Sequence, residues 1–82
     1  MTTNDGWKLI VTPRESVRVQ KHAFHFGYKW ATNPDYELCW IDIPYIFFHL
    51  NKKIYCVELI TKFDNYTNYT TITVKDFLKL TL

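Results

Sequence analysis

The chain has 82 residues, of which 48% are hydrophobic and 22% are charged. A chain of this length forms one domain, residues 1–82, and this composition excludes an intrinsically disordered protein. The net charge of +2 is too small to indicate nucleic-acid binding by itself, whereas an aromatic content of 18% exceeds the needs of one small core and predicts rings at an interface.

The first part of the chain predicts a strand followed by a helix. Residues 7–11 (WKLIV) are apolar and strand-like. The sequence TPRE at residues 12–15 combines a threonine cap, a proline at the first helical position and a glutamate that bonds back to the cap. Gly27 supplies a left-handed residue that ends a helix. These signals predict a helix over residues 13–26.

The predicted helix has two different faces when its residues are placed about 100° apart. The face expected to lie on a sheet comprises Val17, Val19, Gln20, Ala23, Phe24 and Phe26. The outer face carries a cationic stripe formed by Arg14, Arg18, Lys21 and His25. Such a stripe either contacts phosphates or an acidic protein surface, or is simply a solvated helix face.

The middle of the chain predicts short strands. Residues 28–30 begin a strand that a turn at residues 32–35 ends, and residues 38–43 form the next strand before Pro44 interrupts the pattern. Residues 45–50 and 54–60 follow as two strands of a hairpin, since only the polar residues 51–53 separate them.

The C-terminal part completes an α+β domain. It comprises a polar turn region, a last strand and a short closing helix, at residues 64–70, 71–74 and 75–80. The predicted fold is therefore a mainly antiparallel sheet with one helix packed on one face and a short C-terminal helix.

The strand at residues 45–50 is apolar on both of its faces. One face holds Tyr45, Phe47 and His49, and the other holds Ile46, Phe48 and Leu50. A sheet that is apolar on both faces needs two covering layers, and one helix supplies only one. We therefore expect the second face to meet a partner protein or a second copy of the chain. The candidate aromatic interface is Trp40, Tyr45, Phe47 and Tyr55, although a one-residue shift at Pro44 would exchange the two faces.

No catalytic or metal site emerges from the residue pattern. The only plausible dyad joins Cys39 or Cys56 to His49, but both thiols have apolar neighbours that favour burial. His22 and His25 point in directions about 60° apart on the helix, which disfavours a shared zinc ion. We expect a non-enzymatic protein without cofactor or metal. The two cysteines, the absence of an apolar leader and the absence of a membrane-spanning run indicate a cytoplasmic protein.

Residues 16–30 read S-V-x-V-Q-x-x-A-F-x-x-G-Y-x-W, and residues 72–78 read I-T-V-K-D-F-L. Together these two segments resemble small proteins of tailed bacteriophages. The matched positions are a helix face, a helix stop and core aromatics, so the resemblance implies a fold and a phage origin. Phage accessory proteins of this size commonly block or redirect a host protein or a defence system. The resemblance therefore implies host-protein binding in the host cytoplasm.

Two other functions fit the same residues. The cationic stripe and exposed aromatic rings would serve a nucleic-acid-binding protein, the stripe contacting phosphates and the rings stacking on bases. An aromatic pocket at a dimer interface would instead serve a small-molecule sponge.

Overall fold

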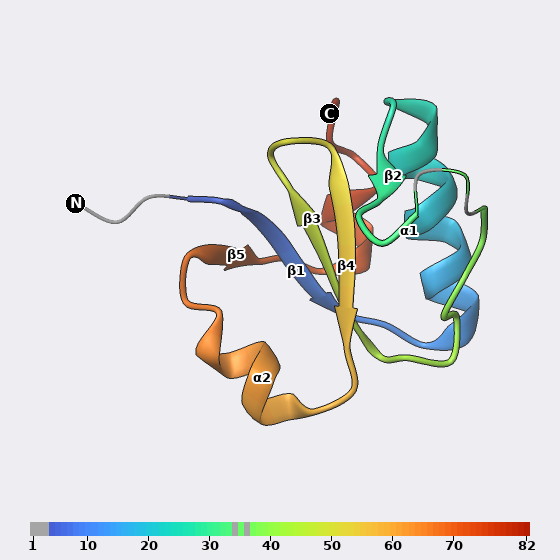
Figure 1. Ribbon diagram of the computed structural model, residues 1–82. Coiled ribbons are helices and arrows are strands. Elements are labelled where there is room, and N and C mark those ends of the chain that lie inside the picture. The colour runs from blue at the N-terminus through green and yellow to red at the C-terminus, as the bar shows by residue number, and fades with distance from the viewer. Residues whose placement is uncertain (1–3, 34, 36) are drawn as a thin grey trace.

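A mixed five-stranded sheet separates helices on its two sides (Figure 1). The computed structural model describes residues 4–33, 35 and 37–82. The strands are β1 (Gly6–Ile10), β2 (Lys29–Trp30), β3 (Tyr45–His49), β4 (Lys53–Val57) and β5 (Tyr69–Thr71). The helices are α1 (Pro13–His25), α2 (Ile60–Asn65) and α3 (Val74–Phe77).

The strand order across the sheet is β2-β4-β3-β1-β5. Strand β3 pairs antiparallel with both β1 and β4, whereas β5 runs parallel to β1 and β2 runs parallel to β4. The α+β class is therefore confirmed, but the sheet is mixed rather than mainly antiparallel. The connection through α2 carries the chain from β4 to the far edge of the sheet, where β5 lies along β1.

Helix α1 has the ends that the sequence predicts. Thr12 Oγ1 accepts a hydrogen bond from the Glu15 amide at 3.2 Å, and Glu15 Oε1 accepts one from the Thr12 amide at 3.0 Å. This reciprocal pair satisfies two of the free amides at the helix start. Gly27 has a φ of +88°, which glycine adopts more easily than other residues, and the helix ends two residues before it.

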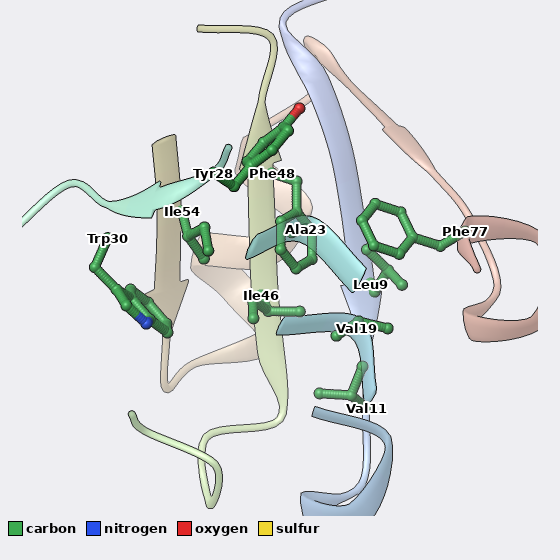
Figure 2. Close-up of a cluster of buried hydrophobic side chains, with 10 residues drawn as sticks. All are labelled: Leu9, Val11, Val19, Ala23, Tyr28, Trp30, Ile46, Phe48, Ile54 and Phe77. Carbon is green, nitrogen blue, oxygen red and sulfur yellow. The ribbon is translucent and has the colours of Figure 1, made fainter. Parts of the chain in front are cut away.

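The main core lies between the sheet and α1 (Figure 2). Leu9, Ile46 and Phe48 point from the strands toward Val19 and Ala23 of the helix. The core also contains Val11, Tyr28, Trp30, Ile54 and Phe77. The ring of Phe77 in α3 stacks on Phe48 with centroids 4.5 Å apart, so α3 closes the same layer as α1.

The hairpin of β3 and β4 has the predicted alternation of faces. Ile46 and Phe48 belong to the main core, and Tyr45, Phe47 and His49 therefore face the other side. Lys52 adopts a φ of +70° in the connecting turn. Leu50 was expected beside Phe48, but it lies in that turn and is exposed.

The predicted strand at residues 38–43 is wrong. This segment is a loop with a turn in which the Ile43 amide donates to the Trp40 carbonyl at 3.1 Å. Side chains rather than a neighbouring strand hold the loop, because Trp30 Nε1 donates to the Glu37 carbonyl at 3.1 Å and Gln20 binds Cys39. Pro34, in the turn predicted before this segment, lies outside the described residues.

The predicted strand at residues 54–60 also ends early. Strand β4 stops at Val57, and Ile60 begins α2 instead of ending a strand. Strand β5 begins two residues before the predicted last strand and ends at Thr71. It does not extend to residue 74, because Thr73 caps α3 through a bond from the Asp76 amide. Short apolar runs of this kind have no periodicity that separates a strand from a short helix.

Candidate protein-binding surface

The second face of the sheet is partly covered by α2, on the side opposite to α1 (Figure 1). The ring of Phe63 in α2 stacks on Phe47 with centroids 5.7 Å apart and lies 5.3 Å from the ring of Tyr45. Tyr66 and Tyr69 approach Phe47 from the other sides, at 5.0 and 5.2 Å. The chain itself therefore supplies part of the second covering layer that we expected from a partner.

This cover removes Phe47 from the candidate interface. The side chain is only 2% exposed, so it belongs to a second, smaller core together with Phe63. Burying a large side chain of this kind contributes roughly 1.5–3 kcal/mol to folding. The sequence does not reveal this cover, because the single phenylalanine of a six-residue helix is a weak signal.

A buried lysine fixes α2 on the sheet. Lys8 of β1 points to the second face, is 7% exposed, and donates from Nζ to the Phe63 carbonyl at 2.8 Å. The same ammonium lies 4.4 Å from the centroid of the Phe63 ring. A cation at the last turn of a helix is favourable because the carbonyl ends of the helix carry partial negative charge.

Apolar side chains remain exposed at one end of this face. The register places Ile10 opposite Tyr45 and Tyr45 opposite Val57, so these three form one row across the sheet. Leu59 follows Val57 at the start of α2 and is 57% exposed. We call this group the apolar end patch: Ile10, Trp40, Tyr45, Val57 and Leu59.

A hollow of about 370 Å³ lies within the apolar end patch. It is lined by Trp40, Ile43, Cys56, Val57 and Leu59, with Glu58 and Lys62 as its polar members. A hollow that combines aromatic and aliphatic side chains with charged groups can receive an anchoring side chain of a partner together with its polar contacts.

Three of the four predicted aromatic residues lie around Val57. Tyr45 is its cross-strand partner, Tyr55 is two residues away on the same face, and Trp40 lines the same hollow. Tyr55 is 41% exposed and Trp40 is 39% exposed. The sequence identified these rings but not Val57 and Leu59, which carry the apolar surface between them.

Trp40 reaches the hollow because the loop that carries it is held to the core. Its ring packs edge-on against the buried Trp30, with centroids 4.8 Å apart. Its backbone has a φ of +49°, which is uncommon for a non-glycine residue and marks a constrained position.

The cationic stripe is on the other side of the molecule. Arg14, Arg18, Lys21 and His25 are all exposed on α1, as predicted. The sheet separates α1 from Tyr45, Tyr55 and Val57, because α1 covers the first face and these three lie on the second. The loop of Trp40 is held to α1 through Gln20, which lies on the buried side of the helix. The structure therefore brings the four cationic positions together but does not bring them to the aromatic residues.

The residues considered for catalysis are also separated by the sheet. Cys56 pairs with Ile46 and faces the main core, whereas the His49 ring packs edge-on against Tyr55 and Tyr69 on the second face. Burial and the nearby charge of Glu58 raise the pKa of the Cys56 thiol, which makes it a poorer nucleophile. These two residues do not form a dyad.

The histidines have structural contacts rather than a common ligand position. His22 bonds to the Leu80 carbonyl at 2.9 Å and packs against Phe77, so it joins α1 to the segment after α3. Among the residues that the structure describes, no three histidine, cysteine or acidic side chains lie close enough to share a metal ion.

Comparisons with known proteins identify no relative of this chain. No family model matches the chain, and no curated protein or solved structure shows significant similarity to it. Within the described part of the chain, no helix has the length and apolar character needed to cross a membrane.

Proposed function

We propose that this chain is a small non-enzymatic binding protein that attaches to a host protein through the apolar end patch and inhibits or redirects it. The observation that carries the proposal is the hollow beside Val57, around which Trp40 and Leu59 remain exposed. Aromatic and aliphatic side chains of this kind contribute most of the affinity in protein interfaces when they become desolvated. The resemblance of residues 16–30 and 72–78 to phage proteins supports a host protein as the partner.

Nucleic-acid binding is supported less well. A strand that stacks on Tyr55 would lie on the second face, whereas the cationic stripe lies on α1 across the sheet. Phosphates and bases of one short strand are only a few ångströms apart, so both surfaces would have to share one side.

Capture from a bacterial lysate with matched variants tests the proposed function. Leu59→Asn places a polar residue in the apolar end patch, and Leu50→Asn makes the same change at a residue of similar exposure, 52%, in the distant hairpin turn. We expect wild type and Leu50→Asn to retain the same host protein and Leu59→Asn and Trp40→Ala to lose it. Equal capture by all four proteins would count against the proposal.

Light scattering after size exclusion separates a host partner from self-association. A dimer that becomes monomeric on Leu59→Asn but not on Leu50→Asn would assign the apolar end patch to a second copy of the chain. A wild-type monomer leaves the apolar end patch available to another protein, as the proposal requires.

A further inference from the structure

A second hollow lies between α1 and α3, on the side of the sheet opposite to α2 (Figure 1). Its volume is about 380 Å³, and it is lined by Glu15, Arg18, Val74, Lys75 and Leu78. Val74 and Leu78 are half-buried and pack against the main core, so they offer an aliphatic surface that is fixed in place. Arg18 and Lys75 are exposed and come from two different helices.

The helices around this hollow concentrate positive charge. We call the group the basic helical surface: Arg14, Arg18, Lys21, Lys75 and Lys79. Over α1 and residues 74–79, these five cations face only two carboxylates, Glu15 and Asp76, which gives a net charge of +3. The whole chain carries +2, so the excess of positive charge is confined to this layer.

Among the five residues that line the hollow, Glu15 is the one acidic residue beside Arg18 and Lys75. The Glu15 carboxylate already accepts a hydrogen bond from the Thr12 amide as part of the helix cap. Arg14, Arg18 and Lys21 are four and three residues apart on one helix, so their like charges repel one another. Two cations beside one carboxylate that already caps the helix leave the hollow with an excess of positive charge, which suits an acidic ligand.

We propose that the hollow between α1 and α3 binds an acidic amphipathic segment of a partner protein. Its carboxylates pair with Arg18 and Lys75, and an apolar side chain of the segment lies on Val74 and Leu78. The aliphatic side chains of Val74 and Leu78 favour an apolar side chain over a nucleic-acid base, because bases require flat aromatic rings for stacking. The inference goes beyond the proposed function, because no residue that lines this hollow belongs to the apolar end patch.

Fluorescence anisotropy with a labelled synthetic peptide tests the inference on the full chain. The peptide places Glu and Asp on one helical face and Leu on the other, and its control replaces each Glu by Gln and each Asp by Asn. We expect the acidic peptide to bind at about 20 mM salt and to weaken strongly at about 200 mM, where screening shortens the range of charge interactions. The neutral peptide is expected not to bind at either salt concentration.

Charge reversal identifies the site. The double variant Arg18→Glu, Lys75→Glu is expected to lower the affinity for the acidic peptide at least about tenfold. Lys29→Glu changes a cation on β2 that is also exposed, and it is expected to alter the affinity less than about twofold. The milder pair Arg18→Gln, Lys75→Gln, with thermal unfolding of each variant, separates loss of binding from loss of folding.

Three results would overturn the inference. One is the absence of peptide binding at low salt, and another is an unchanged affinity in both double variants. The third is tighter binding of a labelled single-stranded DNA than of the acidic peptide, lost in the same variants, because it would assign the basic helical surface to phosphates.

Discussion

The side-chain amide of Gln20 binds both backbone groups of Cys39. Nε2 donates to the Cys39 carbonyl at 2.8 Å, and Oε1 accepts from the Cys39 amide at 3.2 Å. Nε2 also donates to Ser16 Oγ at 3.0 Å, and the side chain of Gln20 is fully buried. The side chain of Gln20 thus makes the two backbone hydrogen bonds that a neighbouring strand would otherwise make. The loop that it holds places Trp40 in the apolar end patch.

Replacing Gln20 by methionine should release this loop. Gln20→Met keeps the shape of the side chain but leaves both groups of Cys39 without their partner, which costs about 1–3 kcal/mol. We expect a lower free energy of unfolding in urea and faster hydrogen exchange at the Cys39 amide. Unchanged exchange at Cys39 would contradict the role of Gln20.

Replacing Lys8 by methionine should loosen α2. The variant keeps the apolar stem on the sheet but loses the bond from Nζ to the Phe63 carbonyl. We expect faster hydrogen exchange across α2, with little change at α1, because the bond connects α2 only to β1. Lys53→Met is the control, since Lys53 has no side-chain bond to α2; equal effects of both changes would refute the prediction.

The two glycines should differ in their tolerance of a methyl group. A Cβ on Gly6 would lie 2.1 Å from the Phe48 carbonyl oxygen, whereas a Cβ on Gly27 would meet nothing within 4 Å. Both have a positive φ, so Gly27→Ala adds backbone strain alone, about 1 kcal/mol. We expect Gly6→Ala to cost more than about 2 kcal/mol and to separate β1 from β3. Thermal unfolding of both variants measures the difference, and equal melting temperatures would show that the sheet moves to accept the methyl group.

Leu59→Asn should stabilise the fold although it disrupts the apolar end patch. Leu59 occupies the N-cap of α2 and makes no side-chain cap bond. Asparagine is among the best capping residues and adds roughly 0.5–1 kcal/mol at such a position. In a domain of this size the melting temperature should rise by about 2–8 °C. A decrease would mean that the leucine side chain supports the fold, and the capture experiment would then need Trp40→Ala alone.

The Cys56 thiol should react slowly. Burial raises its pKa above the ordinary value of 9.0, and the charge of Glu58 adds to the shift. We expect slower alkylation by iodoacetamide at pH 8 in the folded chain than in guanidinium, and a faster rate in Glu58→Gln than in wild type. Asp64→Asn removes a charge that does not act on this thiol and should leave the rate unchanged. Alkylation equally fast with and without denaturant would disprove the shift.

The same shift makes stability depend on pH. The folded thiol keeps its proton at pH values where the unfolded thiol has released it, so the folded state binds more protons. The contribution of Cys56 to stability is therefore complete below pH 9.0 and is lost as the pH rises through the raised pKa.

Local sequence signals determined the elements whose ends and faces are set by residues close together along the chain. Helix α1 was predictable because its cap, its proline and Gly27 are all within a few residues of its ends. The hairpin was predictable because alternation fixes the two faces of a strand, and a short turn fixes its partner. The cationic stripe was predictable for the same reason, since residues three and four apart share one side of a helix.

Tertiary contacts decided the structure of the shortest segments, because a few residues carry too little local signal to specify a strand or a helix. Strand β2 has two residues and β5 has three, so their parallel partners depend on where the rest of the chain lies. Helix α2 forms over residues with no cap and no clear period because Phe63 fits on Phe47 and Lys8 holds its carbonyl end. The place of Trp40 depends on the bonds that Gln20 makes to Cys39, nineteen residues away along the chain. Long-range contacts of this kind bring Trp40, Val57 and Leu59 around one hollow, which no local pattern could indicate.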